Sequence, residues 1–284
     1  MKSTRSSRWL VNGGLLALII IWTLPTIGLL ISSFRNSDVI GSTGWWTVFT
    51  NPGQAGLTFD NYNQVIFGAD TGMATAFLNS IAVTVPAVVI PILIAAFAAY
   101  GFAWMEFPGR RVLFIIIVAL LVVPLQISLI PVLKAYLSLK LNGTLLAIWL
   151  AHTGFGLALA TYLLYGYISM LPKEILESAS IDGASHFQTF TRLVLPLSIP
   201  ALASFAIFQF LWVWNDLLVA NTFLGLDPSV AVVTTRLLSL TGIYGQHWEL
   251  LTSGAFVSMV LPVIVFLALQ RFFVRGLLAG SVKG

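Results

Sequence analysis

Long apolar segments alternate with shorter polar ones along almost the whole chain. The apolar segments cover approximately residues 9–34, 76–105, 112–137, 144–170, 199–223 and 250–274. Each is long enough for a helix to cross a hydrocarbon core, which takes about 20 residues. Strands of a membrane barrel would be shorter segments of alternating polarity. The pattern therefore predicts an all-α integral membrane protein with about six transmembrane helices.

The composition excludes several other classes of protein. Of the 284 residues, 58% are hydrophobic and 8% are charged, whereas a soluble domain is about 25% charged. A soluble globular enzyme is therefore nearly excluded, and a disordered chain would need low hydrophobicity. The sequence has no cysteine, so it forms no disulfide and no thiolate metal site. No Lys/Arg run is long enough for a nucleic-acid patch, so nucleic acid is not an expected partner.

The distribution of Lys and Arg predicts the orientation in the membrane. With the N-terminus inside, ten of the 14 cations fall on the inner side, and the other four are Arg35, Lys134, Lys140 and Arg236. The positive-inside rule then places both termini in the cytoplasm. The apolar run of residues 9–34 exceeds the core of a signal peptide, about 7–15 residues, so we expect a retained helix.

The most informative polar segment is residues 171–196, between the fourth and fifth apolar segments. Pro172 suits the first turn of a helix, and Gly183 suits the left-handed position just past a helix end. Ser185 and Gln188 have the spacing of a capping box, and Pro196 is expected to end the segment. These signals predict two short helices joined at Gly183.

The charges of this loop indicate what it binds. Helices this short are marginal unless they pack on something. A hairpin that lies on the bilayer would have a polar face rich in Lys and Arg. The polar face here is led by Glu174, Glu177 and Asp182. A protein partner is therefore favoured over the bilayer surface.

The same loop resembles a known signature. Glu177-Ser178-Ala179-x3-Gly183, followed by Leu193-x-Leu195-Pro196, resembles the EAA motif of ABC-importer permeases, E-A-A-x3-G-x9-I-x-L-P. Ser178 for Ala and Leu193 for Ile are mild departures. Other segments resemble the carbohydrate-uptake branch of that family, which includes the maltose permeases, and the resemblance covers nearly the whole chain. These segments are Phe59-Asp60-Asn61-Tyr62, Asn79-Ser80-Ile81, Trp214-Asn215-Asp216 and residues 276–284.

The resemblance implies a type I ABC-importer permease fold in the bacterial inner membrane. It implies a heterodimer with a second permease, a cytoplasmic ATPase dimer and an external solute-binding protein. No cofactor is expected on this chain; ATP and Mg would bind the partner ATPase, and the sequence contains no G-x4-G-K-[ST] loop. The implied contacts with the ATPase are Glu177, Ala179, Asp182, Gly183 and Ala184.

The resemblance also implies how the chain is divided. Residues 1–75 would hold the first transmembrane helix and a periplasmic loop, residues 76–275 the permease core, and residues 276–284 a cytoplasmic tail. An outer loop at about residues 224–249 occupies the place of a loop that reaches into the binding protein in the maltose permeases. Its implied contacts with the binding protein are Gly242, Tyr244 and Gln246.

Polar residues within the apolar segments are candidates for the solute path. Such residues usually face a bundle interior. Gln126 and Gln209 are expected near mid-membrane, and Asn215 and Asp216 nearer the outer end of the fifth segment. Amides and a carboxylate suit the hydroxyl groups of a sugar. Hydrogen bonds between helices are the alternative role.

The function expected from these observations is permease-mediated uptake of a sugar or sugar-like solute. Alternatives are a non-sugar polar solute such as a glycerol phosphate ester, or an ion-coupled secondary transporter, although the mid-membrane segments offer only amides. A membrane enzyme would need His152 and Asp216 to converge, and neither H-E-x-x-H nor G-x-S-x-G occurs. His152 is instead expected to be a core histidine with satisfied hydrogen bonds.

Overall fold

The computed structural model describes residues 5–68, 72–225, 227–241 and 247–279. Over these ranges the chain is helical and forms no β-strand beyond an isolated bridge between Arg35 and Leu57. It divides into two compact units, which are residues 1–74 with 236–260 and residues 75–235 with 261–284. The expected division at residues 75 and 275 stays a prediction.

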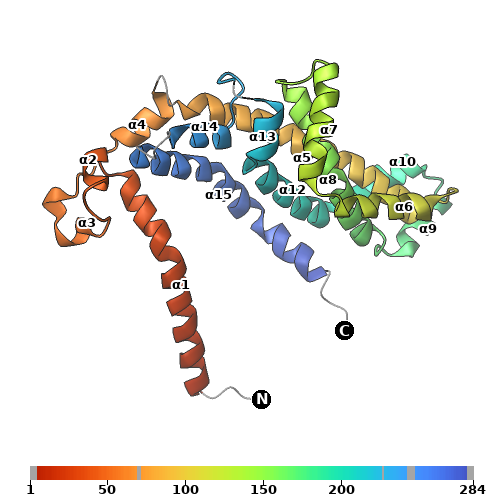
Figure 1. Cartoon of the computed structure of the whole chain (residues 1–284). Helices are drawn as coiled ribbons and strands as arrows, with labels where there is room; N and C mark the ends of the chain where they lie inside the picture. The colour runs from red at the N-terminus through yellow and green to blue at the C-terminus, as the bar shows by residue number, and fades with distance from the viewer. Residues whose placement is uncertain (1–4, 69–71, 226, 242–246, 280–284) are drawn as a thin grey trace. The chain divides into compact units, whose positions relative to one another are not determined.

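The helices are labelled in Figure 1. The first unit contains α1 (Arg5–Ser33), α2 (Ser37–Ile40), α3 (Thr47–Thr50), η1 (Pro52–Gln54) and α4 (Asp60–Phe67). Three helices pass from one unit to the other, namely α5 (Met73–Trp104), α14 (Val233–Leu240) and α15 (Trp248–Ala279). The second unit contains α6 (Arg110–Ala119), η2 (Leu120–Val122), α7 (Leu125–Ser138), α8 (Leu145–Ile168), α9 (Lys173–Ile181), α10 (His186–Thr189), the π-helix η3 (Phe190–Val194), α11 (Leu195–Leu197), α12 (Ile199–Trp214) and α13 (Leu218–Phe223).

The described residues contain up to six membrane spans. Four helices are long and apolar enough to cross unbroken, at Trp9–Ser33, Met73–Trp104, Leu145–Ile168 and Trp248–Arg271. Two further spans are bent pairs of helices, His186–Leu197 with Ile199–Trp214 and Arg110–Val122 with Leu125–Ser138. The predicted all-α membrane fold is therefore confirmed, but two of its spans are not single helices.

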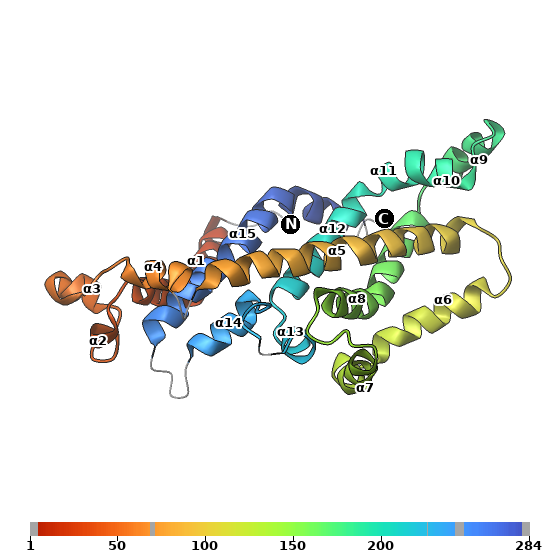
Figure 2. The same ribbon diagram turned by 90° about the horizontal axis from the view of Figure 1, so that it is seen from above.

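The third apolar segment bends by 102° between η2 and α7, and α7 is seen almost end-on beside α6 in Figure 2. The bend follows from Pro124, because the residue before a proline is driven out of the helical region. Val123 is accordingly extended, with ψ 116°. The expectation of one helix over residues 112–137 was wrong for this reason.

The fifth apolar segment also departs from the expected single helix over residues 199–223. Its helix α12 ends at Trp214. The Asp216 carboxylate then accepts hydrogen bonds from the backbone N–H groups of Val219 (3.3 Å) and Ala220 (2.9 Å). These bonds satisfy donors that have no partner at the start of α13, so the chain begins a new helix there.

The core of the second unit lies between α5, α8 and α12 and consists of two clusters. One includes Ala87, Ile148, Val213 and Phe223. The other includes Ala95, Ala96 and Ala99 of α5 with Ala160 and Leu164 of α8. Small residues let helix backbones approach closely in a membrane, where packing replaces the hydrophobic effect.

An amide on α5 holds the segment that precedes α14. The Asn79 Nδ2 donates to the carbonyl oxygens of Ser229 (2.8 Å) and Ala231 (3.0 Å). Its neighbour Ser80 accepts a hydrogen bond from the Val233 N–H at 2.9 Å. The Asn79-Ser80 pair, which resembled a family segment, therefore fixes a non-helical stretch that is about 150 residues away in the sequence.

We expect Asn79→Ala to destabilise the second unit by about 1–2 kcal/mol, because two carbonyls lose their donor. Asn215→Ala is the matched control, since the Asn215 Nδ2 donates to one carbonyl of its own helix, that of Leu211. Thermal unfolding in detergent measures both variants. Equal loss of stability in the two variants would contradict the bridging role of Asn79.

Candidate functional site

The loop between α8 and α12 folds as two short helices joined by a tight turn. Helix α9 begins directly after Pro172, one residue later than expected. At its end Gly183 has φ +74°, its N–H donates to the Ser180 carbonyl, and the Ala184 N–H donates to the Ala179 carbonyl. This is the Schellman arrangement, and it confirms the predicted role of Gly183.

The second helix starts with the predicted capping box. The Ser185 hydroxyl accepts from the Gln188 N–H at 3.3 Å, and the Gln188 side chain accepts from the Ser185 N–H at 2.9 Å. The helix continues through η3 into α11, so Pro196 does not end the segment as expected. Pro196 lies within α11, directly after the π turn of η3. The break falls at Ser198 instead.

The loop is held against α5 by an aromatic cluster. Phe190 and Val194 of η3 are buried in the second core cluster. Phe97 stacks on Phe190 with ring centroids 4.3 Å apart, and the Tyr100 hydroxyl is 3.0 Å from Nδ1 of His186. The sequence prediction missed Tyr100 and His186, and the only available signal was the i, i+3 spacing of aromatic residues on α5.

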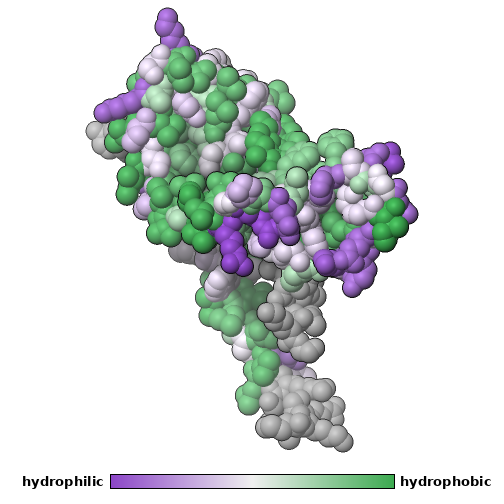
Figure 3. Space-filling view, turned by 90° about the vertical axis from the view of Figure 1, so that its right-hand side faces the viewer, coloured by the Kyte–Doolittle hydropathy of each residue, from purple (hydrophilic) through white to green (hydrophobic). Residues whose placement is uncertain are grey.

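The outward side of α9 is charged and partly apolar. Lys173 Nζ lies 2.9 Å from Glu177 Oε1, and this hydrogen bond with its opposite charge raises the pKa of the Lys173 amine. Ile181 exposes 86% of its surface. Hydrophilic residues gather at this end of the second unit (Figure 3).

The small residues of α9 do not form a single exposed face. Ala179 is buried within the chain. The hydroxyl groups of Ser178 and Ser180 donate to the carbonyls of Glu174 and Leu176 in the same helix. Hollows of about 500 and 550 Å³ flank α9, and Ala184 lines both. Asp182 and Gly183 line the second.

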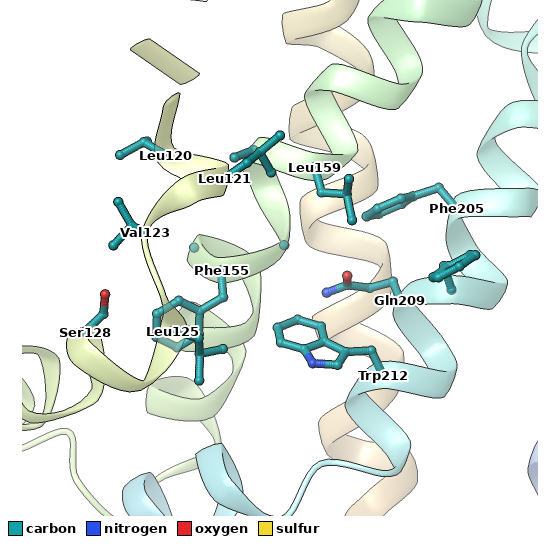
Figure 4. A pocket seen from close by; sticks show the side chains of 14 residues that line it. Leu120, Leu121, Val123, Leu125, Ser128, Phe155, Leu159, Phe205, Gln209 and Trp212 are labelled. Atoms are coloured by element: carbon teal, nitrogen blue, oxygen red, sulfur yellow. The ribbon is translucent and has the colours of Figure 1, made fainter. Parts of the chain in front are cut away.

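A separate pocket of about 580 Å³ lies between η2, α7, α8 and α12. Its lining residues carry no charge. Gln209 projects among Phe205, Trp212 and Leu159 (Figure 4). The Gln209 Nε2 donates to the carbonyls of Ala87 (3.1 Å) and His152 (3.4 Å). Gly156 leaves space for this amide, because a Cβ there would lie 2.7 Å from Nε2.

The four expected solute-path residues are not brought together. Gln209 lines the pocket, whereas Gln126 is exposed on α7 and does not line it. Asn215 is exposed and bonds to the Leu211 carbonyl, and Asp216 caps α13. Their roles toward a solute stay a prediction. Gly242, Tyr244 and Gln246, expected to contact a binding protein, lie outside the described residues.

His152 differs from its expected environment. It is fully buried, and neither ring nitrogen has a hydrogen-bond partner. Its Nε2 is 3.8 Å from Asp216 Oδ2, and its ring stands perpendicular to Trp212 at 5.1 Å. The expectation of a satisfied histidine was therefore wrong, because α8 and the start of α13 bring two groups together without hydrogen-bond geometry. No group of three metal-ligating side chains occurs among the described residues.

Comparison with known proteins decides the family. Residues 76–279 match the family model described as binding-protein-dependent transport system inner membrane component. The chain belongs to this family. It is accordingly a multi-pass inner membrane permease subunit of an ABC transporter.

Named relatives match along nearly the whole permease. It is 58% identical to the osmoprotective compounds uptake permease protein GgtD of Synechocystis sp., over 96% of this chain and 91% of the relative. It is 44% identical to the alpha-glucoside transport system permease protein AglG of Rhizobium meliloti, over 97% of each chain. A chain of the bacterial alginate ABC transporter shares the fold, with a TM-score of 0.65, 16% identity and coverage of 93% of both chains.

We expect Gly183→Ala to weaken the end of α9 by about 1 kcal/mol, because alanine pays for the left-handed conformation. A Cβ at Gly183 would meet nothing within 4 Å, so backbone strain is the only effect. Gly183→Asn should be nearly neutral, since asparagine tolerates this conformation. Hydrogen exchange of the Ala184 N–H measures the difference. Equal exchange in both variants would contradict the Schellman turn.

Proposed function

We propose that this permease takes up a neutral glucoside or a similar sugar-like solute as part of an ATP-driven importer. The observation that carries this is the match, over nearly the whole chain, to permeases named for osmoprotective compounds and for alpha-glucosides. The chain acts as a transport subunit, and ATP hydrolysis takes place on a partner. Both termini and the α9 loop face the cytoplasm, which the distribution of Lys and Arg supports.

The chemistry of the pocket supports an uncharged solute. Its lining combines aromatic rings with an amide and the Ser128 hydroxyl and includes no Lys, Arg, Asp or Glu. A phosphate ester would carry negative charge into a site with no cation to pair with it, which is costly in a low dielectric. A sugar can instead pack its apolar face on Phe155 or Trp212 and hydrogen-bond to the Gln209 carbonyl oxygen.

The loop of α9 and α10 supports coupling to an ATPase dimer. Glu177, Asp182 and the exposed Ile181 are available on its outward side, and Gly183 and Ala184 set the direction of the turn. In this assignment the two hollows beside α9 are filled by the walls of a cleft on the ATPase. The second permease completes the solute path, and a solute-binding protein delivers the solute from outside.

The contacts of the loop with α5 give this coupling a mechanical route. Tyr100, Phe97 and Phe190 tie the loop to α5, and the bent pair of α11 and α12 follows directly in the chain. A pull on α9 therefore moves α5 and α12, which are joined beside the pocket by the hydrogen bond from Gln209 to the Ala87 carbonyl. Rigid-body movement of packed helices is an established route to alternating access.

Reconstituted uptake tests the proposed function. We expect proteoliposomes with both permeases, the ATPase and the binding protein to accumulate a labelled neutral α-glucoside disaccharide at least tenfold faster with ATP than with ADP. A labelled glycerol phosphate ester should compete poorly, because the pocket offers it no cation. Uptake driven by an ion gradient without ATP would overturn the importer assignment, and preference for the phosphate ester would overturn the solute class.

A charge swap tests the coupling role of Glu177. Glu177→Lys alone should prevent co-purification of the ATPase. The double variant Lys173→Glu with Glu177→Lys keeps an ion pair at i, i+4 and places the acid nearer the N-terminus, the better order for a helix. We expect the double variant to stay uncoupled, since the surface charge toward the ATPase is still reversed.

Glu106→Lys is the control for this experiment, because Glu106 lies in the exposed turn between α5 and α6 rather than on α9. It should retain the ATPase. Restored uptake in the double variant would show that Glu177 acts only within its own helix.

A further inference from the structure

The segment that follows α1 is folded around one buried cation. Arg35 exposes 1% of its surface. Its guanidinium donates to the carbonyls of Ala55 (3.2 Å), Thr43 (3.1 Å) and Val39 (3.4 Å), and to the hydroxyls of Thr43 and Thr47. The residues between α1 and α4 are therefore held in one conformation.

This conformation brings the segment back alongside α1. The indole of Trp45 lies over Gly28, where a Cβ would be 2.8 Å from Nε1. Gly28 is in the apolar span of α1, which ends at Ser33. Five residues at a rise of 1.5 Å correspond to about 7.5 Å along the helix. Trp45 therefore sits about one and a half helical turns inside the end of the span.

The residues next to Trp45 form an exposed aromatic surface. Trp46 and Phe49 contact the Trp45 ring edge to face, with centroids 6.0 and 6.5 Å apart. Trp46 exposes 58% of its surface and Phe49 exposes 70%. Leu29 and Leu30, which follow Gly28 on α1, are also exposed.

The charge of the segment fits one kind of environment. Between residues 36 and 59 Asp38 is the only charged residue, and the rest of the polar residues are neutral. Tryptophan is enriched where an apolar core meets lipid headgroups, because its ring is amphipathic. Because this surface has no cations, anionic lipids do not attract it electrostatically. The amphipathic aromatic rings alone favour the interface.

We propose that residues 44–49, which we term the tryptophan loop, lie in the headgroup region of the leaflet where α1 ends and anchor that end of α1 to lipid. The occupant of the aromatic surface is the bilayer itself. A contact with the second permease or with the binding protein is the competing outcome. The anchor does not depend on the proposed solute or on the coupling role of α9.

The absence of cysteine makes single-cysteine labelling straightforward. Trp46→Cys and Phe49→Cys are labelled with an environment-sensitive fluorophore in the complete importer, in nanodiscs that contain a lipid with a nitroxide near its headgroup. Asp38→Cys, exposed in the same segment, is the control for water. We expect at least twofold stronger quenching at positions 46 and 49 than at 38, in neutral lipid and equally with added anionic lipid or salt.

A second pair of variants tests the packing that sets the depth. Gly28→Leu should displace the Trp45 indole and reduce quenching at position 46. Gly14→Leu is the matched control, because a Cβ at Gly14 meets nothing within 4 Å, and it should leave quenching unchanged. Labels at 46 and 49 that are unquenched by lipid, or shielded only when the binding protein or the second permease is present, would overturn the proposal.

Discussion

Three side-chain amides of the described residues each donate to two backbone carbonyls, and two of them hold non-helical parts of the chain. Asn61 holds the carbonyls of Ser33 and Arg35, where α1 ends. Asn79 holds the stretch before α14, and Gln209 holds carbonyls of α5 and α8. A carbonyl that is buried away from water and free of its helix partner needs another donor from the protein. An amide supplies two donors without a charge.

Arg35 likewise holds a non-helical segment by donating to several oxygen atoms, but its side chain is a cation. Its acceptors are all neutral carbonyl and hydroxyl oxygens. Burial lowers the pKa of the guanidinium because desolvation disfavours its charged form, yet arginine remains protonated across the physiological range. A charge without a counterion is tolerated when hydrogen bonds replace its hydration. The resulting fold is rigid where a flexible connection between spans would suffice.

Local signals were predictable from the sequence, and contacts between distant residues were not. The left-handed turn at Gly183 and the capping box at Ser185 and Gln188 are determined by neighbours in the chain, so their residue types were sufficient. Gln126 and Gln209 show the opposite case. They are the same residue type in similar apolar surroundings, but one is exposed and the other buried, because α7 packs in the core through Leu129 and leaves Gln126 outside it.

The contacts that the sequence prediction did not establish have a common cause. Tyr100 with His186 and His152 with Asp216 are pairs 86 and 64 residues apart, which only packing of different helices brings together. The family resemblance located the loop of α9 and α10, but it gave no information about which helix the loop packs against. The aromatic contacts with α5 supply that information.

The π-helical turn of η3 constrains the number of residues that the loop can contain. A π turn contains one residue more than an α turn, and its residues Phe190 and Val194 are locked into the core. Because the π turn absorbs its extra residue within one revolution, deleting a residue ahead of it, such as Thr189, would leave η3 in place and rotate everything before the deletion by about 100° relative to α12. The α9 helix would then point in another direction while every capping residue was still present. The spacing of residues in this region therefore sets the orientation of α9 relative to α12. An insertion or deletion here changes that orientation more than it changes the length of the loop.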